Sequence, residues 1–300
     1  MILDKLKDGR AALMNVDVSD ILIELDGETR TRLQGVLLEM YQDILQVCSR
    51  YDITPFLIAG SALGAIRHEG FIPWDDDLDI GMTRDDYERF ISVFEKELSD
   101  RYNLNAPNYS AAPKTRFAKI MKKGTIFKDV SDTDAPETNG IFIDIFVFEN
   151  VPRNKLVRKL KGMYANALMF ISSQVYLTQN NNEYFQRLYS RAGKSNYYAR
   201  IAIGKLFSYH TAKWWFNRTD QAARYSKRTG LYGNVKGRRH YFCPYLEEKD
   251  MYPPKMVAFA EIQAPVFNNI EGYLTSNFGD YKKLPPVEKR ERHFIREIQF

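Results

Sequence analysis

The segment from Gly60 to Met82, GSALGAIRHEGFIPWDDDLDIGM, constrains the fold and chemistry of this chain more than any other stretch. It ends a short apolar run with Gly-Ser and then gathers four acids within five residues, Asp75, Asp76, Asp77 and Asp79. Alternate side chains of a β-strand point to the same face, so a strand over 77–82 would hold the carboxylates of Asp77 and Asp79 about 7 Å apart on one face. Two carboxylates so placed can share a hard divalent cation. The spacing therefore predicts metal-assisted chemistry on phosphate.

The most apolar segment of the chain, GIFIDIFVF at 140–148, carries one acid, Asp144, in its middle. Its length and its β-branched residues predict a buried central strand. An unpaired carboxylate among Ile and Phe side chains is costly, so we expect Asp144 to have a partner and to join Asp77 and Asp79 as a metal ligand. Aspartates also crowd ordinary turns, but the alternating spacing and the later buried acid favour a metal site.

The turn before the acids is a candidate phosphate site. Gly60 and Ser61 end a predicted strand and begin a predicted helix, where backbone N–H groups and the positive helix end attract phosphate. A plain tight turn is the alternative. Asp75 and Asp76 are expected to be turn residues or to orient the metal ligands.

Three further side chains are candidate substrate contacts. Arg67 can bind phosphate through two hydrogen bonds. The alternative is that it only stabilises a helix C-terminus as a cation. Trp74 can stack on a base or on a quaternary ammonium, or it is a buried structural residue. Lys119 alternates with Phe117 in RFAKIMKK and either faces the site as a phosphate-binding cation or lies exposed on a strand.

Local patterns predict the elements around these residues. Thr83 is expected to cap a helix that runs to about Leu98. Residues 116–121 and 125–128 are expected to pair as a hairpin around a turn at 122–124.

The net charge of +5 conceals a strong asymmetry along the 300 residues. Residues 151–240 contain eighteen Lys or Arg and fifteen aromatic residues, against two acids, Glu183 and Asp220. Their local charge of +16 leaves −11 for the rest of the chain. Such a segment suits a surface on anionic lipid or a cradle for an anionic polymer such as a teichoic acid, and nucleic acid ranks a distant third. The near absence of acids disfavours an ordinary solvated lobe.

Secretory and membrane-spanning segments are not predicted. Residues 1–10 are charged and lack the apolar centre of a signal peptide, and no run of about 18 apolar residues exists. We therefore expect a cytoplasmic protein. With 44% apolar residues, the chain has ample material for a core and about two domains.

Gly-Ser, Asp-x-Asp on the next strand and a third acid on a later strand together resemble the nucleotidyltransferase fold. The whole segment 60–82 is similar to the LicD phosphocholine transferase family, and fukutin-related sugar-alcohol phosphate transferases share this block. GIFIDIF at 140–146 and YLTSNFGDYKKLPPVEKRERH at 273–293 continue the resemblance. It covers roughly residues 35–150 and 255–293 and leaves the basic middle unmatched.

The closing motif of the resemblance adds two candidate site residues, Arg290 for the substrate and His293 for catalysis. With an ordinary pKa near ~6.5, a histidine can act as a base or as a neutral hydrogen-bond donor. An ordinary surface histidine is the alternative.

The resemblance implies an α/β fold, with a nucleotidyltransferase-like mixed sheet flanked by helices. It also implies a catalytic core at 1–150 and a C-terminal segment at 241–300 that completes the active site. The composition and helical pattern of the unmatched residues 151–240 predict a basic, aromatic-rich helical lobe inserted between them. The resemblance further implies an enzyme that uses Mg²⁺ or Mn²⁺. The reaction would transfer phosphocholine, or a similar phospho-alcohol, from a CDP-linked donor to a hydroxyl of a cell-surface glycan and release CMP. Lipopolysaccharide, teichoic acid and a lipid-linked precursor are the candidate acceptors.

Choline, ethanolamine, glycerol and ribitol all stay open as the headgroup. Two other functions also stay open: a nucleotidyltransferase that transfers NMP and releases pyrophosphate, and a non-catalytic module that binds an anionic polymer or a membrane. The intact acids disfavour the second of these. Peripheral association with the inner face of the membrane through residues 151–240 would suit a lipid-linked acceptor.

Overall fold

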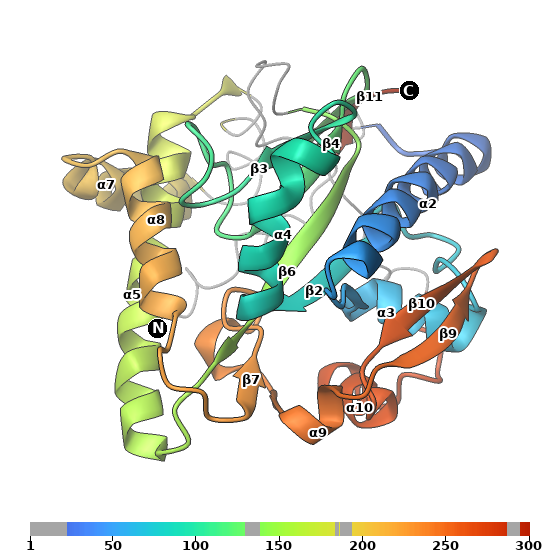
Figure 1. Cartoon of the computed structure of the whole chain (residues 1–300). Coiled ribbons are helices and arrows are strands. Elements are labelled where there is room, and N and C mark those ends of the chain that lie inside the picture. Colours follow the sequence, from blue (N-terminus) through green and yellow to red (C-terminus); the bar gives the residue numbers. More distant parts are fainter. Residues whose placement is uncertain (1–22, 130–138, 184–185, 187–193, 287–294) are drawn as a thin grey trace.

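A computed structural model describes residues 23–129, 139–183, 186, 194–286 and 295–300 (Figure 1). Within them, a mixed sheet runs in the order β1-β2-β6-β4-β3, and β7 and β8 extend it from β6. Its strands are β1 (Phe56–Leu57), β2 (Asp79–Thr83), β3 (Tyr102–Asn105), β4 (Ala118–Lys122), β6 (Phe142–Asn150), β7 (Leu231–Gly233) and β8 (Tyr245–Glu247).

Two small antiparallel sheets and a set of helices accompany the mixed sheet. The small sheets are β9 (Lys255–Phe259) with β10 (Ile262–Val266), and β5 (Ile126–Asp129) with β11 (Ile295–Gln299). The described helices are α2 (Gly27–Arg50), α3 (Ala59–His68), α4 (Arg84–Glu97), α5 (Lys155–Gln179), α7 (Lys194–Phe207), α8 (Ala212–Ala223), η2 (His240–Phe242), α9 (Glu248–Met251) and α10 (Ile270–Phe278). The predicted α/β class, a mixed sheet flanked by helices, is confirmed.

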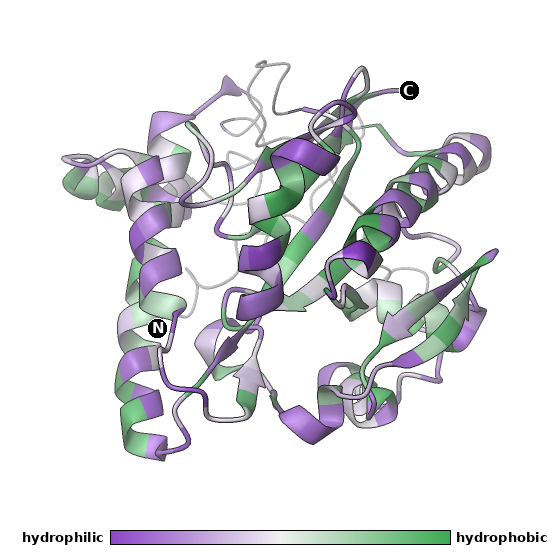
Figure 2. Ribbon diagram, viewed as in Figure 1, coloured by the Kyte–Doolittle hydropathy of each residue, from purple (hydrophilic) through white to green (hydrophobic). Residues whose placement is uncertain are grey.

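The central strand is β6, as its apolar sequence predicted. It is parallel to β2 and antiparallel to β4, and its last residues are antiparallel to β7. Ile143, Ile145 and Val147 point into the core and are almost wholly buried, and Figure 2 shows hydrophobic residues along the strand. A parallel pair such as β2 and β6 needs a crossover connection, which α4, β3 and β4 supply.

Helix α4 begins and ends where its sequence predicted. The Thr83 side chain accepts a hydrogen bond from the Asp86 N–H at the N-cap, and the helix runs to Glu97. Tyr87 and Phe90 are buried on its inner side. The helix follows β2 directly and packs on β2 and β6, so the cap fixes the direction in which the chain leaves the sheet.

The predicted hairpin between residues 116–121 and 125–128 is wrong. Strand β4 has β3 on one edge and β6 on the other, so neither edge is left for β5. Strand β5 pairs with β11 in a separate sheet instead.

Helices α5, α7 and α8 confirm the helical structure that the sequence pattern of the basic segment, residues 151–240, predicted. Both α7 and α8 pack against α5, and a second hydrophobic cluster, separate from the main core, includes Val151, Met169, Trp215 and Phe216. Strand β7 also comes from this segment and joins the mixed sheet. The division of the chain at residues 151 and 241 stays a prediction. None of the described helices is both long and apolar enough to cross a membrane.

Asp220, one of the two acids of the basic segment, is buried between α8 and the sheet. Its Oδ1 atom lies 2.9 Å from Arg84 Nη2 and 2.5 Å from Lys236 Nζ, and Arg84 also pairs with Glu149 near the end of β6. Burial opposes ionisation of Asp220, but Lys236 and Arg84 hold its pKa well below the usual range. Two acids and two cations therefore tie α8 to the end of β6.

Candidate active site

Three charged side chains form a row across adjacent strands. Asp79 and Asp144 are partners in the parallel β2–β6 ladder, and Lys119 on β4 is the antiparallel partner of Asp144. Partners on neighbouring strands lie about 4.8 Å apart with their side chains on the same face. Lys119 Nζ is 2.8 Å from Asp144 Oδ1, and Asp144 is only 8% exposed. The partner expected for the buried acid is therefore Lys119, with Asp79 alongside.

Aromatic rings flank this row on the same face of the sheet. Strand alternation places Phe142 and Phe146 with Asp144, and the centre of the Phe117 ring, just before β4, lies 5.7 Å from Lys119 Nζ. Lys119 Nζ lies 3.3 Å from the centre of the Phe142 ring, and the rings of Phe117 and Phe146 are 4.5 Å apart. Phe142 and Phe146 are half-buried, whereas the β6 residues between them are buried. This face is therefore the more accessible one, and alternation in GIFIDIF was the signal for its two aromatic residues.

The three acids before β2 converge on one another. One carboxylate oxygen from each of Asp75, Asp76 and Asp77 lies within 4.8 Å of the others. Strand β2 begins at Asp79 and not at residue 77 as expected, so strand alternation does not set the direction of Asp77. The structure thus groups Asp77 with the two acids that the sequence assigned to turn or orienting roles.

Gly60 and Ser61 lie in the first turn of α3, next to acids of both groups. A Cβ atom on Gly60 would come within 2.9 Å of Asp75 Oδ2, so a larger residue would displace that carboxylate. Ser61 is buried, and its Oγ accepts a 2.8 Å hydrogen bond from the Asp79 N–H. Both residues position acids, and their contact with phosphate stays a prediction.

Tyr273 on α10 is a residue of this site that sequence reasoning missed. Its hydroxyl accepts a 3.0 Å hydrogen bond from the Ala59 N–H, and Ala59 opens α3 with a φ of 47°. Burial raises the pKa of Tyr273, the Ala59 hydrogen bond opposes the shift, and the nearby charge of Asp79 adds to it. Its place at the start of the closing motif was the signal that could have identified it.

Arg67 connects the end of α3 to the C-terminal segment. Its Nη1 donates to the Tyr281 carbonyl at 3.0 Å, and its Nε donates to His68 Nε2 at 3.0 Å. Burial lowers the pKa of Arg67, and the charge of Asp75 opposes that shift. The His68 ring stands edge-on to Trp74 at 6.3 Å between ring centres. Arg67 and Trp74 thus border the acids, and their contacts with substrate stay predictions.

The two remaining predicted residues, Arg290 and His293, lie outside the described part of the chain. Their roles in substrate binding and catalysis stay predictions.

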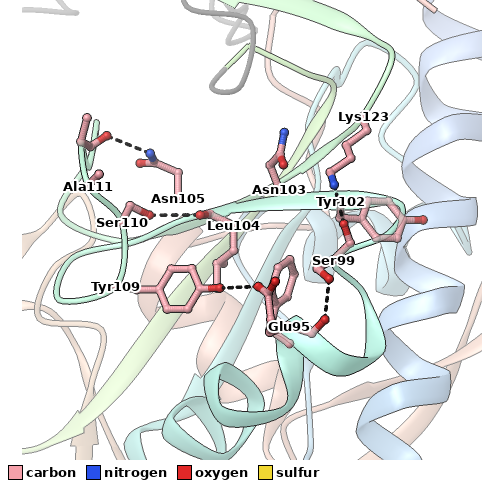
Figure 3. Close-up of a pocket in the computed structure, with 12 residues that line it drawn as sticks. Glu95, Ser99, Tyr102, Asn103, Leu104, Asn105, Tyr109, Ser110, Ala111 and Lys123 are labelled. Atoms are coloured by element: carbon pink, nitrogen blue, oxygen red, sulfur yellow. Dashed lines mark hydrogen bonds between the residues drawn. The ribbon is translucent and has the colours of Figure 1, made fainter.

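A cavity of about 540 Å³ opens beside β3 and the end of α4, at one edge of the mixed sheet (Figure 3). Tyr109 donates to Glu95 at 3.2 Å, and Ser110 donates to the Leu104 carbonyl at 3.0 Å. Strand β4 separates this edge from β6. None of the predicted site residues that the structure describes lines this cavity, so we place the candidate site at the charged row.

The donor atoms at the row suit a hard cation. The acids are all carboxylates, whose oxygens are preferred ligands of Mg²⁺. Asp144 Oδ1 is buried and, apart from its ion pair with Lys119, accepts no hydrogen bond of good geometry from the described residues. A buried carboxylate oxygen that accepts no such hydrogen bond can ligate a cation, and the neighbouring group of Asp75, Asp76 and Asp77 offers three more carboxylates, so the residues present fit a metal.

Together, the mixed sheet and the paired acids define a nucleotidyltransferase-like domain. The family model for the LicD/FKTN/FKRP nucleotidyltransferase domain matches residues 52–180. The lipopolysaccharide cholinephosphotransferase LicD of Haemophilus influenzae is 31% identical over 274 residues, which are 88% of this chain and 95% of the relative. An uncharacterized protein of Rickettsia typhi is 35% identical over 71 residues, 23% of each chain.

The chain therefore belongs to the LicD family, and it is a transferase. The resemblance predicted from residues 60–82, 140–146 and 273–293 is confirmed. Similarity also extends further than predicted, because the family match continues to residue 180, past the end of α5 in the basic segment.

Proposed function

We propose that this enzyme transfers phosphocholine, or a closely similar phospho-alcohol, from a CDP-linked donor to a hydroxyl of a cell-surface glycan or its lipid-linked precursor. CMP is the leaving product, and Mg²⁺ or Mn²⁺ is required. The Haemophilus influenzae relative is a lipopolysaccharide cholinephosphotransferase, which supports the choice of transferred group and acceptor.

The observation that carries this proposal is the pairing of Asp79 with Asp144. These acids are far apart in the chain, yet the parallel β2–β6 ladder makes them direct neighbours. Like charges held together in a largely buried place are costly unless a cation lies between or beside them. Lys119 supplies one positive charge beside Asp144, and a divalent cation would add positive charge next to both acids.

We assign Asp77, Asp79 and Asp144 as the metal ligands. A divalent cation held by these carboxylates would supply positive charge to the diphosphate and so stabilise the charge that develops on the leaving CMP. Ser61 fixes the backbone at Asp79 through the 2.8 Å hydrogen bond. Lys119 keeps a positive charge on the row, next to the phosphate to be transferred. Most of the catalysis is then positioning and electrostatics.

Two roles belong to residues of the closing motif. A carboxylate that ligates a divalent cation is a poor base, so we propose His293, and not Asp144, as the group that takes the proton of the acceptor hydroxyl. Arg290, also in the closing motif, and Arg67 near the end of α3 are proposed to hold the donor phosphates. Peripheral attachment to the inner face of the membrane through residues 151–240 is also part of the proposal, because a lipid-linked acceptor lies in a bilayer.

The test is product analysis. With CDP-choline, Mg²⁺ and an acceptor glycan, the enzyme should release CMP, and a chelator should stop the release. A panel of CDP-alcohols would identify the headgroup. Pyrophosphate formed from a nucleoside triphosphate would favour the nucleotidyltransferase alternative, and the absence of metal-dependent turnover would favour a binding module.

Substitution of the acids tests the metal assignment. We expect Asp77→Asn and Asp79→Asn each to lower CMP release by at least about 10²-fold, since each removes a ligand charge at the reacting phosphate. Their thermal unfolding should stay close to wild type. Asp100→Asn, at an exposed position, is the matched control and should keep full turnover. Near-normal turnover in either active-site variant would exclude this metal set.

A further inference from the structure

The first half of α5 exposes an unusual number of large apolar side chains. These residues are 44% to 66% exposed: Leu156, Val157, Leu160, Met163 and Tyr164. At about 100° of rotation per helical residue, they fall within an arc of about 120° on one side of the helix. The opposite side contributes Gly162, Ala165, Leu168 and Met169 to the buried surface. Helix α5 is therefore apolar on two faces, one packed and one open.

Cations border the open apolar face. Lys155 and Lys159 lie at one margin, exposed, and Lys161 lies at the other, where its Nζ donates to the Ala222 carbonyl at 2.8 Å. Arg153 pairs with Glu247 at 2.6 Å, whereas Lys155 and Lys159 have no ion pair within the described residues. The segment 151–182 contains no acid.

The cations near the start of α5 do not stabilise the helix through its dipole. The first turn of α5 holds no acid but does hold Lys155 and Arg158, and a positive charge at a helix N-terminus is unfavourable. An external anionic surface would offset this disadvantage.

Neighbouring helices cover the rest of α5 and leave this face open. Helix α7 meets the second half of α5, where Arg200 donates to Gln174 at 3.3 Å. Figure 1 shows the first half of α5 extending beyond α7 toward the end at which β6 leaves the sheet, and Figure 2 shows hydrophobic and hydrophilic residues mixed along it. A second copy of the chain is a poor occupant, because a two-fold contact would set the cations of this acid-free segment against the same segment of the other copy, with no acids to compensate.

We propose that the first half of α5 docks on a bilayer that contains anionic lipid. The helix lies in the plane of the interface, its apolar face enters the acyl boundary, and Lys155 and Lys159 reach the lipid phosphates. Tyr164 takes the headgroup depth that such aromatic residues favour. A soluble anionic polymer offers phosphates but no apolar layer, so it leaves the five exposed side chains unexplained. The inference specifies the surface used by the peripheral attachment in the proposed function, and it rests on that part alone.

Co-sedimentation with vesicles tests the docking surface. The wild-type protein should bind vesicles of phosphatidylglycerol with phosphatidylcholine, should not bind phosphatidylcholine alone, and should be released by salt. The double variant Leu160→Gln/Met163→Gln should bind at least about tenfold more weakly, because each substitution removes buried apolar groups. The double variant Lys155→Gln/Lys159→Gln should lose about fivefold in affinity for each lysine.

Met256→Gln is the matched control. Met256 lies on β9 and is 56% exposed, against 55% for Met163, so this control matches the Met163 substitution in chemistry and exposure and differs from it in position. The control should bind vesicles as wild type does. CMP release from a water-soluble acceptor should be equal in all variants, which separates failure of the docking surface from failure of the proposed reaction.

Three outcomes would overturn the proposal. One is vesicle binding by the Leu160→Gln/Met163→Gln variant that equals that of wild type. Another is wild-type binding that does not depend on lipid charge, or an absence of wild-type binding to anionic vesicles. The third is a concentration-dependent dimer that the same variant abolishes, or binding of a soluble polyphosphate that it abolishes equally. Either form of the third outcome would assign the face to self-association or to polymer binding.

Discussion

Asp144 and Lys119 show how a charge is accommodated in an apolar strand. Asp144 stands between Ile143 and Ile145, both fully buried, and Lys119 reaches it from β4 at 2.8 Å. The ammonium also lies over the Phe142 ring, a favourable place for a cation. Because a buried charge without its partner is much more costly than the pair, Lys119 allows an acid at a position where the surrounding sequence is apolar.

Replacement of Lys119 should therefore destabilise the protein in a metal-dependent way. We expect Lys119→Met to lose about 2 kcal/mol of unfolding free energy, less than for a fully buried pair because both side chains keep some solvent contact. Mg²⁺ should restore more stability to this variant than to wild type, since a bound cation replaces the lost ammonium. Chemical denaturation with and without Mg²⁺ measures both effects.

Lys96→Met supplies the comparison for this experiment. Lys96 is 79% exposed and pairs with Glu97 at 3.4 Å on the surface. Its loss should change the unfolding free energy by less than about 0.5 kcal/mol. An equal response of the two variants to Mg²⁺ would contradict a metal at Asp144.

At the scale of elements, the first turn of α3 is where distant parts of the chain meet. Ala59 has a positive φ, which a residue with a Cβ atom adopts at a cost, and its N–H is held by the Tyr273 hydroxyl from α10. Two residues later, Ser61 holds the start of β2 at Asp79. Helix α10 thus supports the first turn of α3, which in turn holds the start of strand β2.

Tyr273→Phe should show how far the first turn of α3 depends on its contact with α10. Removal of the hydroxyl leaves the Ala59 N–H without its acceptor, so we expect a loss of about 1–3 kcal/mol in unfolding free energy. CMP release should fall about tenfold, as for other residues that orient a metal ligand. Tyr198→Phe, at an exposed tyrosine of α7, should change neither quantity. Wild-type turnover in Tyr273→Phe would show that α10 serves only the fold.

Local signals predicted single elements well and strand pairing less well. The Thr83 cap and the boundaries of α4 depend on residues within one turn of each other, and the sequence displays them directly. The hairpin of β4 with β5 failed because both edges of β4 are taken by β3 and β6. Which edges are taken depends on strands elsewhere in the chain, and no pattern inside residues 116–128 contains that information.

At the scale of the molecule, buried ion pairs join the helical segment to the sheet. Asp220 on α8, Arg84 on α4, Glu149 on β6 and Lys236 are brought together from four places in the sequence. Their charges balance, which is what makes their burial tolerable. Asp220, one of the two acids of the basic segment, therefore has a structural role: it anchors the segment to the sheet and, being buried, adds no negative charge to the surface of the segment.

Asp220→Asn should therefore weaken the whole protein, and the effect should depend on pH. At neutral pH we expect a loss of about 3 kcal/mol, because Arg84 and Lys236 lose a buried partner. The pKa of Asp220 is lowered in the folded protein, so its contribution to stability is complete above the ordinary carboxylate pKa of about 4 and declines as the pH falls below it. The difference between variant and wild type should shrink over that acidic range.

Denaturant unfolding at a series of pH values measures this difference. Glu248→Gln is the control, since Glu248 pairs with Arg228 at 3.2 Å on the surface and its loss should cost less than about 1 kcal/mol. A difference for Asp220→Asn that is constant down to the most acidic pH would show that its charge is not what stabilises the junction.

The sequence by itself determined the acidic segment before β2, the apolar strand with one acid, the cap of α4 and the family. Each of these depends on contiguous residues, so periodicity, capping and an unbroken motif display them. Only the tertiary structure decided that Asp79, Asp144 and Lys119 share one row, that Asp75 and Asp76 converge with Asp77, that Tyr273 supports the first turn of α3, and that Asp220 is buried. Apart from the convergence of the three adjacent acids, these facts are contacts between residues far apart in the chain, and strand register and burial select such contacts only when the whole core assembles.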